Sequence, residues 1–185
     1  IACGSALIRL CALDHFGGAL GSTDRKVLLT LRLRRAWRKK CLWCKNNNVE
    51  HSQQIFTPAS LSTPAAADWE WPCLKAKAHN CSVVVRWLAA ELEGDWSHDR
   101  PRRLMGRLFW SLAKCDYIFG TGPQWLEDPH VERLKLARDV LFSTWTSLAS
   151  LDRDNGQAGW AFIPKHHLVE HTLDDCIEDR RNPGG

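Results

Sequence analysis

Apolar residues in this chain recur at intervals of three and four positions, and this spacing restricts the fold more than any other feature. Between positions 74 and 92 they are Leu74, Ala78, Cys81, Val85, Leu88 and Leu92. Steps of this size place side chains on one face of an α-helix. Similar series occur in 104–112 and 131–148, whereas the alternation typical of β-strands is nearly absent. The sequence therefore predicts an all-α fold, an irregular bundle of five to seven helices.

Helix-starting and helix-ending residues divide this pattern into segments. We expect helices over 2–13, 25–45, 74–92, a segment opened by Pro101 that includes 104–112, 128–150 and 164–180, and a short helix at 59–61. Asp24 is an expected N-cap, and glycines at 120 and 122 end a helix. Residues 57–72 are rich in Pro, Ser and Ala. We interpret 1–56 as N-terminal helices, 57–72 as a connector and 73–185 as a C-terminal bundle.

Composition is ordinary except for its tryptophans. The 185 residues are 44% hydrophobic and 25% charged, which suits a globular protein. The ten Trp are spread along the chain, which favours packing between helices over a row of ligand-stacking rings. No apolar run reaches the 18 residues needed to span a bilayer, so we expect no membrane span.

Eight cysteines at irregular spacing favour buried free thiols in a reducing intracellular compartment. Cys41 and Cys44 form a CxxC pair, the spacing used in zinc knuckles and in redox sites. A redox site needs a βαβ context that the sequence does not predict. A knuckle needs a second close pair, and the only candidates, at unsuitable spacing, are Cys73, His79 and Cys81.

Positive charge is concentrated in the second expected helix. Residues 24–45 contain nine Lys or Arg and one acid, whereas the whole chain carries only +4. Such a helix could lie along nucleic-acid phosphates, because each cation there releases a counterion. An anionic membrane surface, the acidic C-terminal helix and plain solvation are the alternatives. The predicted nucleic-acid or anion-binding residues are Arg32, Arg34, Arg35, Arg38, Lys39 and Lys40.

Ligand-type side chains gather near the C-terminus. His167, Glu170 and His171 follow the H-x-x-E-H pattern, in which two histidines hold zinc and the glutamate acts as general base. Asp174 or Asp175 could supply an oxygen ligand. The motif is short, and that enzyme class takes its third ligand from further downstream. We therefore favour structural histidines, with no cofactor and no catalytic residue; zinc held by His167, His171, Asp174 and Asp175, with Glu170 as base, is the alternative.

Several short segments follow one another in a recognisable order. Residues 44–53 read Cys-Lys-Asn-Asn-Asn-Val-Glu-His-Ser-Gln, with Phe56-Thr57 after them, and 74–78 read Leu-Lys-Ala-Lys-Ala. Residues 163–167 read Ile-Pro-Lys-His-His, followed by His171 and Asn182-Pro183. In this order the chain, over most of 24–185, resembles the repetitive, transposon-like open reading frames of dinoflagellate genomes. The resemblance implies descent from a mobile element and a nuclear location, an organelle being the alternative.

That family continues after the Asn-Pro pair into an acidic cluster faintly similar to the last catalytic region of cut-and-paste transposases. No such cluster lies within these 185 residues, so the resemblance implies no complete nuclease site here. Three functional hypotheses follow. The favoured one is a non-catalytic helical interaction module, or accessory subunit, with a protein partner in a larger assembly. The alternatives are a nucleic-acid-binding, transposase-like fragment and a zinc-dependent hydrolase.

Overall fold

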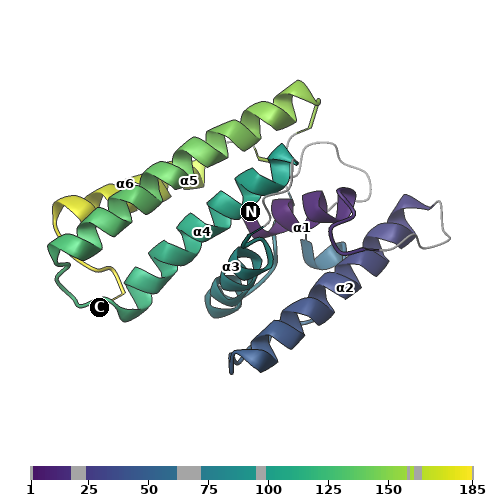
Figure 1. The fold of residues 1–185 in the computed structure, drawn as a ribbon, viewed down its shortest axis with the longest axis horizontal. Coiled ribbons are helices and arrows are strands. Elements are labelled where there is room, and N and C mark those ends of the chain that lie inside the picture. Colours follow the sequence, from purple (N-terminus) through teal and green to yellow (C-terminus); the bar gives the residue numbers. More distant parts are fainter. Residues whose placement is uncertain are drawn as a thin grey trace. The chain divides into compact units, whose positions relative to one another are not determined.

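The structure, a computed structural model, describes residues 2–17, 24–61, 72–94, 99–157, 159–160 and 164–184. Within these residues the chain forms α-helices and one short 3-10 helix, in agreement with the predicted all-α fold (Figure 1). The elements are α1 (Ala2–Ala12), α2 (Arg25–Asn46), η1 (Ala59–Leu61), α3 (Ala78–Glu91), α4 (Arg100–Thr121), α5 (Asp128–Asp154) and α6 (Pro164–Glu178). In the described part of the chain, no helix is long and apolar enough to cross a membrane.

The chain divides into two compact units. The N-terminal unit comprises residues 1–88 and 158–160, and the C-terminal unit comprises 89–157 and 161–185. The division falls between Leu88 and Ala89, inside α3. Most of the predicted connector 57–72, namely 62–71, lies outside the described residues, so the predicted domain boundaries stay a prediction. On either side of this gap, η1 and the segment before α3 are paired, because the amide of Lys75 donates to the carbonyl of Ser60 at 2.8 Å.

The same pairing explains why α3 begins four residues later than predicted. The amide of Cys73 donates to the carbonyl of Leu61 at 2.8 Å. Residues 73–75 are therefore in non-helical backbone, with the amides of Cys73 and Lys75 bonded to η1, although Leu74 fits the helical period and is buried. Tertiary hydrogen bonds override the sequence pattern here.

In the N-terminal unit, α1 packs against α2. The buried contact surface contains Leu7 and Leu10 of α1 and Leu33 and Ala36 of α2. The predicted N-cap of α2 is confirmed, since the Asp24 carboxylate accepts a hydrogen bond from the amide of Lys26 at 2.8 Å. Burial of each leucine side chain contributes about 1.5–3 kcal/mol to the stability of the unit, and an N-cap contributes about 0.5–2 kcal/mol.

An aromatic cluster forms part of the core of this unit. Trp87 of α3 is buried, and its ring stacks with Phe16 at 6.1 Å and with Phe56 at 6.2 Å between centroids. Trp87 is thus a core residue, as predicted for the tryptophans, although both rings that it stacks on lie outside the helices. Two other tryptophans, Trp110 and Trp125, are exposed instead.

The C-terminal unit is built on α4 and α5, which lie side by side, with α6 packed against α5 (Figure 1). As predicted, Pro101 lies in the first turn of α4. Buried residues of the three helices form the core: Met105, Leu108, Leu134, Leu141, Leu173 and Cys176. Asn182 joins the C-terminal end of the chain to the end of α4, because its side-chain amide donates to the carbonyl of Gly122 at 3.0 Å.

Candidate functional site

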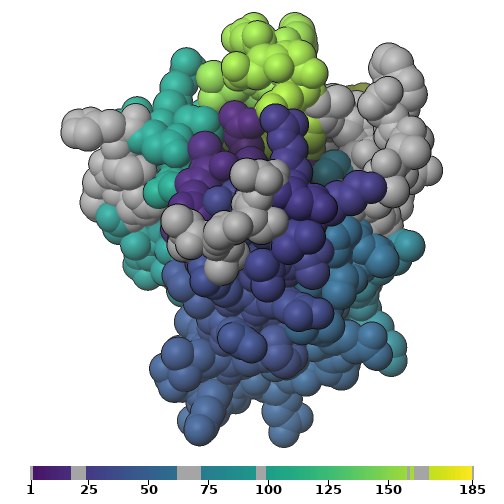
Figure 2. Space-filling model, turned by 90° about the vertical axis from the view of Figure 1, so that its right-hand side faces the viewer, coloured from purple at the N-terminus to yellow at the C-terminus, as the bar shows by residue number. Residues whose placement is uncertain are grey.

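The basic residues predicted on α2 divide into three groups with different surroundings. Arg34, Arg38 and Lys39 are exposed, and α2 forms a large part of the face of the molecule seen in Figure 2. Arg32 and Arg35 are half-buried and contact the chain that follows α1. The guanidinium of Arg32 donates to the carbonyl of Cys11 at 2.8 Å and pairs with Asp14 at 2.8 Å, and Arg35 donates to the carbonyl of Gly17.

These two arginines therefore serve the fold. Carbonyls near a helix C-terminus have no intrahelical partner, and a cation there satisfies them and complements the helix dipole. The positive charge of α2 that faces solvent is accordingly smaller than the sequence count indicates. Of the six predicted residues, Arg34, Arg38 and Lys39 are exposed, and Nζ of Lys39 lies 5.9 Å from the centroid of the Phe16 ring.

The prediction of Lys40 as an anion-binding residue is wrong, because its side chain is 0% exposed. Its Nζ lies 3.0 Å from Nδ1 of His51 and 6.0 Å from the centroid of the Phe56 ring. Burial lowers the pKa of the Lys40 ammonium, an effect that nearby Cys41 and Cys44 oppose. Burial, and then the Lys40 charge, lower the pKa of His51. The Lys40 side chain is therefore part of the core of the N-terminal unit and not of its surface.

The sequence contained a signal for this burial. Lys40 stands four residues after Ala36 and four before Cys44, both of which are buried on the same side of α2. Helical periodicity therefore places Lys40 on the core face, although residue type alone predicts an exposed position.

The predicted C-terminal residues lie on α6 but do not converge on one point. The rings of His167 and His171 are 4.9 Å apart, and Nδ1 of His167 lies 3.3 Å from the Glu170 carboxylate. Asp174 instead forms an ion pair with Arg138 of α5, and Asp175 is exposed. Among the described residues, no group of three His, Cys, Asp or Glu side chains is placed to hold a metal ion.

The cysteines of the CxxC pair are free thiols, with Cys41 half-buried and Cys44 buried. Burial raises the pKa of both thiols, and the Lys40 charge opposes this. The other residues considered for a zinc knuckle have different contacts: a ring nitrogen of His79 lies 3.0 Å from the carbonyl oxygen of Glu50.

The most developed surface feature lies on α4, which we call the α4 face. It consists of five exposed side chains at successive steps of four, three, four and three residues: Arg103, Arg107, Trp110, Lys114 and Tyr117. This spacing holds them in one stripe along the helix. Trp110 is 40% and Tyr117 is 62% exposed, which is unusual for rings that large in a chain whose core uses other tryptophans.

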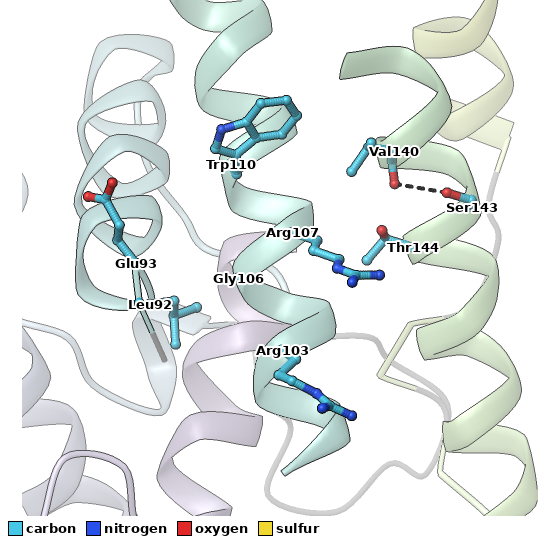
Figure 3. Close-up of a pocket in the computed structure, with 10 residues that line it drawn as sticks. Leu92, Glu93, Arg103, Gly106, Arg107, Trp110, Val140, Ser143 and Thr144 are labelled. Carbon is cyan, nitrogen blue, oxygen red and sulfur yellow. Dashed lines mark hydrogen bonds between the residues drawn. The ribbon is translucent and has the colours of Figure 1, made fainter. Parts of the chain in front are cut away.

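A pocket of about 520 Å³ opens beside this stripe, entirely within the C-terminal unit (Figure 3). Its wall on α4 is formed by Arg103, Arg107 and Trp110, and its wall on α5 by Val140, Ser143 and Thr144. In Figure 3 both arginines extend from α4 toward α5, whereas Glu93 lies on the opposite side of α4. The volume is within the range of sites that accept a small organic group.

Gly106 keeps α4 close to the turn that ends α3. A Cβ atom at this position would lie 3.3 Å from the carbonyl oxygen of Leu92, closer than most packed neighbours. Because Gly106 has only a hydrogen atom in place of a side chain, α4 packs closely against the turn. Gly106 lines the pocket without adding a side chain to it.

The cations of the α4 face are available to a partner. In the residues that the structure describes, Arg103 and Arg107 have neither an ion pair nor a side-chain hydrogen bond. Lys114 contacts Trp110 instead, with Nζ 5.9 Å from the centroid of the ring. A cation over a ring contributes on the order of 0.5–1 kcal/mol at an exposed site and restricts the orientation of the ring.

The sequence analysis does not predict this site, because the apolar positions of α4 indicate its core face and say nothing of a role for the rest of the helix. The signal was nonetheless present, since the two aromatic residues are seven positions apart and three cations occur at matching steps. Comparison of the chain with protein families, with curated proteins and with solved structures finds no match.

Proposed function

We propose that this protein is a non-catalytic helical interaction module, and that the α4 face is the surface through which it binds an anionic partner. The observation that carries this proposal is the stripe itself, in which Arg103, Arg107 and Lys114 alternate with exposed Trp110 and Tyr117. Arg, Trp and Tyr are the residue types that contribute most binding energy at interfaces.

The charge of the surface determines the sign of the charge on its partner. Three cations of the α4 face have no carboxylate partner among the described residues, so an incoming anion would not need to displace an existing ion pair. Cations on one face also raise the local concentration of anions and accelerate their association at low salt. An apolar partner alone would leave these charges desolvated without compensation.

Packing supports a binding role for α4 over a purely structural one. The side of the helix that faces away from the α4 face, with Met105, Leu108 and Phe109, is buried in the core of the C-terminal unit. The two rings of the α4 face are only partly buried by the fold, since Trp110 is 40% and Tyr117 is 62% exposed. A partner that covered Trp110 and Tyr117 would remove apolar ring surface from water.

A charge-neutralising double variant tests the proposal. Arg103→Gln with Arg107→Gln is compared with Arg34→Gln and Arg38→Gln, a matched pair of exposed arginines one turn apart on α2. Binding of the intact protein to inorganic polyphosphate is measured by titration at low salt. We expect the α4 pair to weaken binding about ten-fold and the α2 pair to weaken it much less. Equal weakening by both pairs, or none by the α4 pair, would contradict the proposal.

A further inference from the structure

The α4 face combines two features that separate one class of anionic partner from the others. Its charges are interleaved with rings, and one of these rings, Trp110, lines a pocket (Figure 3). We propose that the partner is single-stranded nucleic acid, with phosphates held by Arg103, Arg107 and Lys114 and with bases stacked on Trp110 and Tyr117. This inference rests on the proposed function and specifies its partner.

The exposure of the rings supports stacking. Lys114 covers part of Trp110 from one side, and the residue is still 40% exposed, so ring surface remains for a base. Every base has a flat π-face, and an exposed aromatic side chain binds it without sequence preference. A cation held beside the ring then lies where the adjoining phosphate has to pass.

The spacing of the rings indicates a single strand over a duplex. Trp110 and Tyr117 are seven residues apart, or about 10 Å along the helix axis at roughly 1.5 Å per residue. Bases in a duplex are stacked on one another about 3.4 Å apart and expose only their edges in the grooves. Bases that reach two rings about 10 Å apart must be unpaired and unstacked, which a single strand allows.

The pocket provides room for one such base or its sugar. Its volume is about 520 Å³, and it is bounded by Arg107 and Trp110 on α4 and by Ser143 and Thr144 on α5. The hydroxyl of Ser143 already donates to the carbonyl of Asp139 at 2.6 Å, and its oxygen can still accept a hydrogen bond from a base amino group. A base inserted here would lie between the two arginines and the first ring.

An acidic polypeptide is the competing partner, because it would also bind Arg103 and Arg107. It offers carboxylates for the cations but no regular series of flat rings for Trp110 and Tyr117. The two partners therefore differ in how much each depends on the aromatic side chains. That difference, and not the strength of binding, decides between them.

The test measures binding of the intact protein by fluorescence anisotropy with three labelled probes at the same low salt: a 15-nucleotide oligothymidylate, a hairpin duplex of similar charge, and polyglutamate. The variants are Trp110→Ala, Trp110→Phe and the Arg103→Gln with Arg107→Gln pair. Circular dichroism and the melting temperature of each variant establish that it is folded, as expected for exposed positions.

We expect the oligothymidylate to bind at least ten-fold more tightly than the duplex or polyglutamate. Trp110→Ala should weaken oligothymidylate binding about five-fold or more, and Trp110→Phe should retain most of it, because loss of one stacked base has an effect of this size. The arginine pair should lower the salt dependence of binding by roughly 1.4 in log–log slope, about 0.7 for each lost phosphate contact.

Two outcomes would overturn the inference and leave the proposed function standing. One is polyglutamate or duplex binding as tight as that of the oligothymidylate, with loss in the arginine pair. The other is oligothymidylate binding that needs the arginines but not the ring of Trp110. If the arginine pair changes the binding of none of the three probes, the proposed function fails together with the inference.

Discussion

Lys40, which is buried, pairs with the half-buried His51 in the N-terminal unit, with Nζ of Lys40 3.0 Å from Nδ1 of His51. A protonated Lys40 donates to the unprotonated Nδ1 of His51. Protonation of His51 as well would place two positive charges next to each other, which is unfavourable. Burial lowers the pKa of both groups, and the Lys40 charge lowers that of His51 further. The stability of this unit should depend on pH through these two residues.

The expected direction follows from the sign of the shifts. A base with a pKa lower in the folded than in the unfolded chain binds protons more weakly when folded, so stability falls as pH falls. For His51 the loss begins as pH drops through its ordinary value of 6.5 and continues down to its folded pKa. Denaturant midpoints measured between pH 8 and pH 5 should decrease, and His51→Gln should reduce that decrease. An unchanged pH profile in His51→Gln would contradict this explanation.

Lys40 should behave as a core residue when it is substituted. Lys40→Ala would leave a cavity beside Phe56 and is expected to destabilise the unit by about 2–4 kcal/mol, as for other large-to-small core changes. Lys40→Met fills a similar volume without a charge and should cost far less. Lys45, exposed in the last turn of the same helix, is the control, with an expected cost of about 0.5 kcal/mol or less for Lys45→Ala. Chemical denaturation measures all three, and equal effects at Lys40 and Lys45 would show that Lys40 is not buried.

The attachment of α6 to α5 should depend on apolar packing more than on charge. Leu173 is 2% exposed, whereas Arg138 and Asp174 are each about one-third exposed in their ion pair. An exposed pair contributes about 0–1 kcal/mol, and a buried leucine about 2–5 kcal/mol on truncation. We expect Leu173→Ala to increase hydrogen exchange across 164–178 strongly and Asp174→Asn to increase it slightly. A larger increase in hydrogen exchange for Asp174→Asn than for Leu173→Ala would mean that the ion pair holds α6 against α5.

Glu93 supplies a carboxylate to the lining of the α4 pocket, and it opposes any anion that binds there. Removing this charge should therefore improve binding. A unit charge at the edge of an aqueous pocket contributes on the order of 0.5 kcal/mol, or roughly two-fold in affinity. Glu93→Gln should raise the affinity for polyphosphate by about that factor at low salt and by less at high salt. Weaker binding in Glu93→Gln would indicate that the partner lies elsewhere.

How far the sequence predicts the structure varies by element. The starts of α2, α4 and α5 agree with the prediction from the apolar period and from Asp24 and Pro101, because these helices bury one continuous face. The end of α5 does not, since this helix continues to Asp154, four residues beyond the predicted end. The start of α3 and the division of the chain inside α3 depend on long-range backbone hydrogen bonds to η1 and on tertiary packing, which no local pattern encodes.

The candidate site was predictable only in part. The excess of positive charge on α2 was evident, but the sequence does not show that Arg32 and Arg35 bond to the segment after α1 or that Lys40 is buried. The side chains of the α4 face recur at a clear helical period, but their exposure depends on which side of α4 the fold buries. The resemblance to transposon-like reading frames and the zinc alternative at His167 and His171 remain predictions.

The central claim is that an anionic partner covers the α4 face, and lysine modification tests it without any substitution. Lys114 of α4 and Lys45 of α2 are both exposed and lie in different units. The intact protein is acylated with and without saturating oligothymidylate, and the rate at each lysine is measured by mass spectrometry. Bound polymer should slow acylation of Lys114 several-fold and leave Lys45 nearly unchanged. Protection of Lys45 with an unchanged rate at Lys114 would contradict the account.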